Sequence, residues 1–408
     1  MSQKNLKTNR RGSAAAESIL VAVCALALFP VAYLDNMYPT LSTLYTWAPL
    51  VAFCFCCLHM IANRVELYLD SFTVGVGAFC VVLMSVSLLS AYSSTVYSLQ
   101  LSCRYMALIL LCIIVCKSDR SDRLIKVLFS VFFLYTVANT ITVFLFPNSM
   151  YQNNRGWDVC WLLGGDNFAV RYYILTVLFA LLSDMGNAVR PRSVLALINY
   201  GVYVFVRFCG MGIITFLILS AMMTPFVKER LQGKARLFHV FVAGVVAFAA
   251  VVVFGQSDVF TPILDLLGKD ATLSARTRIW QTTFELLQDH LMLGYGALRG
   301  SAIEILLYFP GMTNVHNTFL TVFLFGGVVL CSIFVFILFK VSTWADARLD
   351  PPVLYVFIAC CLALVFHAQV EGNYIEILFL AYALPYYMAS DSEKKYSAAQ
   401  LEVQGLKR

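Results

Sequence analysis

The sequence has 408 residues, of which 60% are hydrophobic and only 13% are charged, and its mean hydropathy is +0.78. A soluble globule of this length needs more charged surface, so the composition excludes a soluble enzyme, a secreted disulfide-rich domain and a nucleic-acid-binding protein. The 29 Lys and Arg against 23 Asp and Glu give a net charge of +6, which in a membrane protein reflects the orientation of the loops.

Apolar segments long enough to cross about 30 Å of hydrocarbon as helices follow one another along the chain. They lie at residues 14–34, 44–62, 71–91, 96–117, 123–147, 167–184, 193–209, 210–226, 237–254, 317–340, 353–370 and 373–390. The predicted fold class is therefore all-α, a polytopic membrane protein with about 12 transmembrane helices. The segments 193–209 and 210–226 are short and almost contiguous, so a re-entrant hairpin is an alternative there.

The basic residues indicate the orientation of these spans. If the N-terminus is cytoplasmic, 21 of the 29 Lys and Arg fall in inner segments, as the positive-inside rule requires. We therefore expect both termini in the cytoplasm, with 1–13 and 391–408 as tails of a single domain over 1–408. The outer face then carries a small loop at 148–166 and a large loop at 255–316, between spans nine and ten.

Seven of the eight remaining basic residues are arginines. Arg104, Arg171 and Arg207 fall in the outer halves of their spans. They either extend separately to the outer headgroups or line one shared polar cavity. Arginine suits phosphate, because its planar fork donates two parallel hydrogen bonds and stays protonated.

Within the large loop, Ser274–Tyr295 predicts a helix with Ser274 as N-cap and Gly294 as its end. Its apolar stripe consists of Ile279, Thr283, Leu287 and Leu291. Arg276 falls in the first turn, where free N–H groups and the helix dipole attract an anion. Arg278 lies about 200° further round the helix, so we expect Arg276 to be the main anion ligand.

His316 and Asn317 stand where span ten begins on the outer side. A neutral imidazole there can take a proton from an attacking hydroxyl, although a purely structural hydrogen bond at the helix start is the alternative. Glu371 and Glu376 flank the start of span twelve on the same side. They could orient His316, bind a sugar or pair with an arginine. No acidic metal motif occurs on an outer segment, so we expect neither a metal nor another cofactor.

Three stretches resemble the O-antigen ligase and polysaccharide polymerase family of membrane glycosyltransferases. Residues 273–296, LSARTRIWQTTFELLQDHLMLGYG, are similar to the family's arginine-containing loop helix with its Leu-Gly-Tyr-Gly turn. Residues 315–330, VHNTFLTVFLFGGVVL, resemble its His-Asn motif followed by a glycine-broken helix. The stretch GDNFAVRYYI at 165–174 resembles an asparagine-containing start of a span and brings in Asn167.

The resemblance implies an inverting, metal-independent enzyme that takes a glycan from undecaprenyl diphosphate at the outer face of a bacterial plasma membrane. It maps the diphosphate-binding arginine to Arg276 and the base to His316, with Arg278 as a secondary candidate. Many members carry Ser-Arg-Gly between spans seven and eight, whereas this sequence has VRFCGMGII at 206–214, so Arg207 is offset.

Three functions stay open at this point. A polymerase would transfer the growing chain to a lipid-linked repeat unit, with flippase and chain-length regulator proteins as further partners. A ligase would transfer a finished glycan to lipid A core or another surface acceptor. A flippase for lipid-linked oligosaccharide would also suit twelve spans, but such transporters usually show two similar halves, and none are visible here.

Overall fold

The computed structural model describes residues 3–63, 65, 70–152, 159–185, 190–253, 276–310, 312–372 and 374–405. Almost all of them lie in helices. The first half contains α1 (Gln3–Leu28), α2 (Ala32–Met37), α3 (Pro39–Ala62), α4 (Ser71–Leu89), α5 (Thr95–Lys117), α6 (Ser121–Leu145), β1 (Tyr151–Gln152), β2 (Val159–Cys160) and α7 (Asp166–Ser183). The second half contains α8 (Pro191–Arg207), α9 (Gly210–Met223), α10 (Pro225–Leu231), α11 (Leu237–Phe248), η1 (Ala249–Val253), α13 (Arg276–Asp289), α14 (Gly300–Leu307), α15 (Thr318–Arg348), α16 (Pro351–His367) and α17 (Ile375–Gly405).

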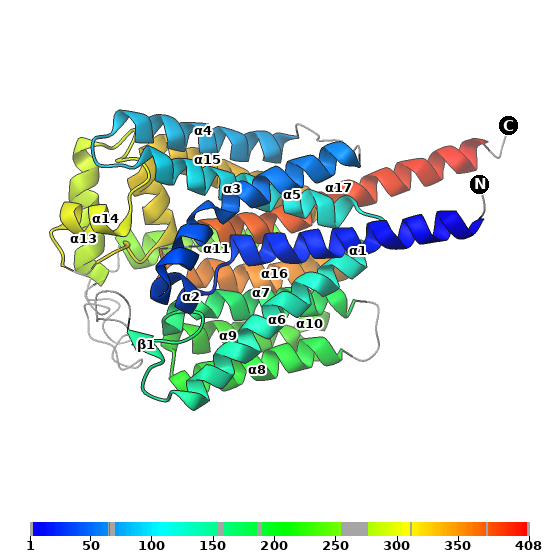
Figure 1. Ribbon diagram of the computed structural model, residues 1–408, viewed down its shortest axis with the longest axis horizontal. Helices are drawn as coiled ribbons and strands as arrows, with labels where there is room; N and C mark the ends of the chain where they lie inside the picture. Colours follow the sequence, from blue (N-terminus) through cyan, green and yellow to red (C-terminus); the bar gives the residue numbers. More distant parts are fainter. Residues whose placement is uncertain are drawn as a thin grey trace.

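The long helices run roughly along one common direction and form a bundle (Figure 1). The short helices α13 and α14 gather at one end of the bundle with α2 and strand β1, whereas both chain termini lie at the other end. We call the end of the bundle that contains α13 the α13 end. The two strands pair antiparallel, with Tyr151 opposite Cys160.

A helix overlaps each of the twelve predicted spans. Among the described residues, six helices are long and apolar enough to cross a membrane, or seven if α9 and α10, bent by 73°, count as one. Several further apolar helices, including α11 and α16, are shorter than the usual limit. The chain is thus an all-α, multi-pass membrane protein, while the count of twelve spans and their orientation stay predictions.

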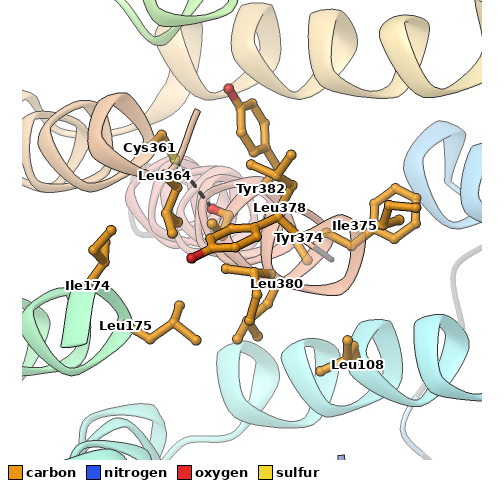
Figure 2. Packing of buried hydrophobic residues seen from close by; sticks show 14 of the residues in the cluster. Leu108, Ile174, Leu175, Cys361, Leu364, Tyr374, Ile375, Leu378, Leu380 and Tyr382 are labelled. Atoms are coloured by element: carbon orange, nitrogen blue, oxygen red, sulfur yellow. Dashed lines mark hydrogen bonds between the residues drawn. The ribbon is translucent and has the colours of Figure 1, made fainter. Parts of the chain in front are cut away.

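The centre of the bundle is formed by helices that are buried almost all round. Side chains of α5, α7 and α16 point toward α17, among them Leu108, Leu175 and Leu364 (Figure 2). Small residues such as Cys360 and Cys361 are fully buried in α16, as expected where helices of a membrane protein approach closely. In contrast, α3 lies at the periphery, since 22% of its apolar window is buried.

Candidate active site

A cavity of about 680 Å³ lies among the helix ends and loops of the α13 end. Its wall is built by residues from the segments 28–36, 97–105, 151–172, 276, 313–325 and 371–376. Seven of the predicted site residues line it: Arg104, Asn167, Arg171, Arg276, His316, Glu371 and Glu376. Arg207, Arg278 and Asn317 do not belong to the lining. The sequence therefore brings chemically relevant side chains from widely separated segments to one space.

Arg276 is the first residue of α13 and projects into this cavity. Its Nη2 donates a hydrogen bond to Oε1 of Glu371 at 3.1 Å, which also makes an ion pair. Arg278 lies elsewhere on the helix, with its guanidinium 5.6 Å from the centre of the Phe309 ring. The two arginines thus lie on different sides of the helix, as their spacing of about 200° predicts.

The apolar face of α13 fixes the direction of Arg276. Ile279, Trp280, Thr283 and Leu287 are all buried, and the Trp280 indole donates to the backbone oxygen of Val315 at 2.9 Å. The predicted end of this helix was wrong, because α13 ends at Asp289 and Leu291 is exposed. The proposed N-cap, Ser274, lies outside the described residues.

The turn after α13 is held by a break in α15. Gly326 and Gly327 leave the helical conformation, and the open backbone of α15 bonds to residues 291–296. The bonds run from the amides of Tyr295, Gly296, Val328 and Val329 to the carbonyls of Leu324, Phe325, Leu291 and Met292, over 2.8–3.2 Å. A side chain at Gly327, whose φ is +60°, would collide with the Met292 carbonyl group. The turn at residues 293–296 and the break at Gly326–Gly327 are therefore bonded to each other, and we call this contact the joint between α13 and α15. The sequence pattern alone did not reveal it.

His316 occupies a left-handed backbone conformation, with φ of +48°. Few residues other than glycine adopt it, and such strain is common at functional sites. The Asn314 side chain stabilises it by accepting a hydrogen bond from the His316 amide at 2.7 Å. Within the described part of the chain, Nδ1 of His316 is buried without a hydrogen-bond partner and lies 3.9 Å from Oε2 of Glu371.

The imidazole of His316 is neutral at physiological pH. Burial, reinforced by the positive charge of Arg276, lowers its pKa from 6.5 to about 4. The approach of His316 to Glu371 is therefore not an ion pair near pH 7, even though the two side chains are close. A neutral imidazole in this position can accept a proton.

Asn317 lies outside the cavity lining and fixes the backbone next to His316. Its side-chain oxygen accepts from the Leu320 amide at 2.8 Å as the N-cap of α15, and its Nδ2 donates to the Gln369 carbonyl at 2.9 Å. Thr318 adds a hydroxyl bond to the Glu371 carbonyl at 2.6 Å. These bonds hold His316 and Glu371 side by side, so Asn317 acts on the geometry of the site from a buried position.

A second arginine–carboxylate pair lies on another wall. Nη1 of Arg171 donates to Oε1 of Glu376 at 3.2 Å, and both side chains are largely buried. The Arg171 guanidinium also stacks on Phe168, 3.6 Å from the ring centre. Phe168 precedes Arg171 by three residues on α7, a spacing that places both on one helix face and could have revealed the contact from the sequence.

Arg207 lies beside the cavity and contacts the start of α7 and the small loop before it. Its Nε donates to Oδ1 of Asp166 at 2.9 Å, and its guanidinium lies 3.7 Å from the Trp161 ring centre. The adjacent Asn167 lines the cavity and accepts a hydrogen bond from the Cys209 thiol at 2.9 Å. Arg207 thus joins the small loop to the start of α7.

Asp35 and Asn314 are among the polar residues of the site that sequence reasoning missed. Asp35 lines the cavity from α2, a separate six-residue helix at Ala32–Met37 that was not predicted, since the first predicted span ran to residue 34. Asn314 was missed although an asparagine two residues before a strained position is a recognisable turn signal.

The fold and this cavity define a class: a multi-pass membrane protein with a site in which fixed arginines and a neutral histidine face one polar space. Residues 195–335 match the family model described as O-Antigen ligase. The match confirms the resemblance found in the sequence, over 141 of the 408 residues. No curated protein and no solved structure matches the chain.

The matched segment contains Arg276 and His316, whereas Arg104, Arg171, Glu371 and Glu376 lie outside it. The match supports a membrane glycosyltransferase of the O-antigen ligase and polymerase type, a class that acts on lipid-linked glycans in polysaccharide biosynthesis. The apolar helices agree with this class, since they make the chain a multi-pass membrane protein.

Proposed function

We propose that this protein is a polysaccharide polymerase of the bacterial plasma membrane. It would transfer a glycan from undecaprenyl diphosphate to the sugar hydroxyl of a lipid-linked repeat unit at the outer face. The observation that carries the proposal is the meeting of Arg171, Arg276 and His316 in one cavity, because the reaction needs an anion site beside a base. The family match adds the reaction class.

The chemical step is a displacement at the anomeric carbon of the donor. The acceptor oxygen forms a bond to this carbon from one face, while the bond to the diphosphate oxygen breaks on the opposite face and inverts the configuration. The hydroxyl proton passes to Nε2 of His316, and undecaprenyl diphosphate leaves. General-base assistance of this kind typically contributes about 10²–10⁴-fold in rate.

Arg276 and Arg171 are the proposed ligands of the departing diphosphate. Each binds a glutamate through one guanidinium nitrogen, and a guanidinium carries five N–H donors in all. The glutamates hold the two forks in place before the donor arrives. Fixed positive charges would meet the charge that develops on the leaving group, so a divalent metal is not required.

Glu371 is the proposed orienting residue of His316. A hydrogen bond from Nδ1–H to Glu371 would leave Nε2 unprotonated and directed to the acceptor. The 3.9 Å separation is longer than a hydrogen bond and would shorten when substrate fills the cavity, since catalytic hydrogen bonds often tighten in the complex.

Reconstitution tests the proposal against the ligase alternative. The purified protein in liposomes receives a synthetic undecaprenyl-diphosphate-linked repeat unit, and the products are separated by chain length. A ladder of longer lipid-linked glycans, with one undecaprenyl diphosphate released per step, supports the polymerase. Transfer that occurs only when lipid A core or another surface lipid is added would instead establish a ligase. Flippase and chain-length regulator proteins are proposed partners, and the ladder assay can include them.

A further inference from the structure

A small side branch opens beside the main cavity. It has a volume of about 120 Å³ and shares Pro30, Asp35, Tyr97, Leu101 and Arg104 with the main cavity. Its remaining lining is Tyr45, Thr46 and Gln100. At about 30 Å³ per water molecule, this volume suits a group of phosphate size and is too small for a sugar chain.

Two unsatisfied donors mark this branch. Gln100 and Arg104 stand one turn apart on α5, which places them on one helix face. In the part of the chain that the structure describes, Nε2 of Gln100 and Nε of Arg104 are buried without a hydrogen-bond partner. A buried donor left without a partner is destabilising, so a ligand that accepts from both would be bound favourably.

Arg104 also differs from the other arginines of the cavity in its charged neighbours. Arg171 and Arg276 each hold a glutamate, whereas no carboxylate among the described residues lies within 4 Å of Arg104. An arginine within a membrane span is costly to insert and usually marks a functional site. The side branch therefore offers a positive charge that nothing in its described surroundings neutralises by contact.

The position of the branch suggests the side from which its ligand arrives. Tyr45 and Thr46 belong to α3, whose Leu44, Trp47 and Val51 are exposed and, in a membrane-spanning helix, face lipid. Asp35 lines the same branch and repels phosphate, but its carboxylate can accept hydrogen bonds from the hydroxyl groups of an adjoining sugar. The branch thus suits a phosphate that carries both a lipid and a sugar.

We propose that Arg104 and Gln100 bind the phosphate of the membrane-embedded acceptor lipid, apart from the donor diphosphate on Arg276 and Arg171. This inference rests on the proposed transfer reaction. It assigns separate arginines to the two lipid substrates and explains how one cavity can hold both. The shared chemistry is a lipid phosphate, whether the acceptor is a polyprenyl-diphosphate glycan or a phosphorylated surface lipid.

Kinetics of purified variants in nanodiscs test the assignment. Arg104→Met removes an intramembrane charge, so the amount of folded protein should not fall, and Gln100→Leu removes only the amide. Both should raise the KM for the acceptor, by about tenfold or more for Arg104→Met, as expected for losing a charge-assisted hydrogen bond. The donor KM should stay unchanged. Arg230→Gln on the exposed part of α10 controls for the lost positive charge.

Equilibrium binding of undecaprenyl diphosphate without sugar gives a second readout. Two molecules should bind to the wild-type protein, and one to either Arg104→Met or Arg276→Gln. A single molecule bound by the wild type, an equal rise of donor and acceptor KM in Arg104→Met, or no change in either would each overturn the second site. These results leave the proposed transfer intact, which fails separately if Arg276→Ala transfers glycan at the wild-type rate.

Using both acceptor types identifies the source of the phosphate. An acceptor KM that rises only with the polyprenyl-diphosphate glycan supports the site for a polymerase substrate. A rise with the phosphorylated surface lipid supports the same site for a ligase substrate.

Discussion

At the scale of single residues, the neutral state of His316 makes a pH prediction. Burial and Arg276 lower its pKa to about 4, so the free enzyme keeps an unprotonated base at every pH well above 4. The acid limb of kcat/KM, which reports the free enzyme, should therefore lie near pH 4 and not near the usual histidine value of 6.5. The measurement is initial transfer rate against pH at low donor concentration. A limb near 6.5 would show that His316 is exposed or is not the base.

The same depressed pKa affects stability. Between pH 6.5 and about 4 the unfolded state binds a proton that folded His316 does not, so this contribution to stability is complete above pH 6.5 and is lost as the pH falls toward 4. His316→Gln, which cannot titrate, should lose less stability than the wild type between these pH values. Thermal unfolding at several pH values measures the difference, and identical pH dependence of both proteins would contradict it.

The planar guanidinium group of Arg276 leads to a further prediction about a single residue. Arg276→Lys keeps the charge but loses the paired donors, so transfer should drop substantially while the amount of protein in the membrane stays near normal. Arg278→Ala should be milder, because Arg278 lies outside the cavity lining beside Phe309. Equal losses in both variants would mean that the first turn of α13 presents two guanidinium groups to the donor.

At the scale of elements, the joint between α13 and α15 should control the site from a distance. Gly327→Ala would meet both a positive φ and the Met292 carbonyl, and strain of this kind costs about 1–3 kcal/mol. We expect a lower midpoint of thermal unfolding and reduced transfer, although no cavity residue is changed. Gly77→Ala is the matched control, because a Cβ there meets nothing within 4 Å. Equal behaviour of the two variants would disprove the role of the joint.

The elements also show what sequence reasoning can reach. Hydrophobic segments long enough to span a bilayer predicted where helices lie, because the need to satisfy backbone groups in lipid allows little else. The early end of α13 at Asp289 and the break of α15 at Gly326 depend on backbone bonds between residues that are 29 or 37 positions apart. Local propensity carries no information on such bonds, so the predicted helix ran too far.

At the scale of the whole molecule, the candidate site could be predicted as a set of residue types but not as a geometry. Arginines in apolar helices and a histidine at a helix start stand out because they are costly or unusual in lipid. Which carboxylate each arginine takes, Glu376 for Arg171 and Glu371 for Arg276, depends on how α17 and the connection that precedes it pack against the rest of the bundle. Among the residues that the structure describes, Arg104 has no carboxylate within 4 Å.

Orientation is the prediction that concerns the whole chain. The termini and α13 lie at opposite ends of the bundle (Figure 1), and the distribution of basic residues predicts that the termini are cytoplasmic. A reporter that works only in the cytoplasm should therefore give a signal when it is fused at the C-terminus. A reporter that works only outside the cytoplasm should give a signal when it is inserted at Asp289. A cytoplasmic signal at Asp289 would remove the outer-face reaction from the account.

The most direct measurement of the central claim is a cryo-EM structure of the protein with undecaprenyl diphosphate. The account predicts diphosphate density in the main cavity, within hydrogen-bond distance of Arg276 and Arg171, with the polyprenyl chain leaving between helices toward lipid. His316 should face the space where the anomeric carbon of a donor would stand. Diphosphate bound away from Arg276, or a main cavity that stays empty at saturating lipid, would contradict it.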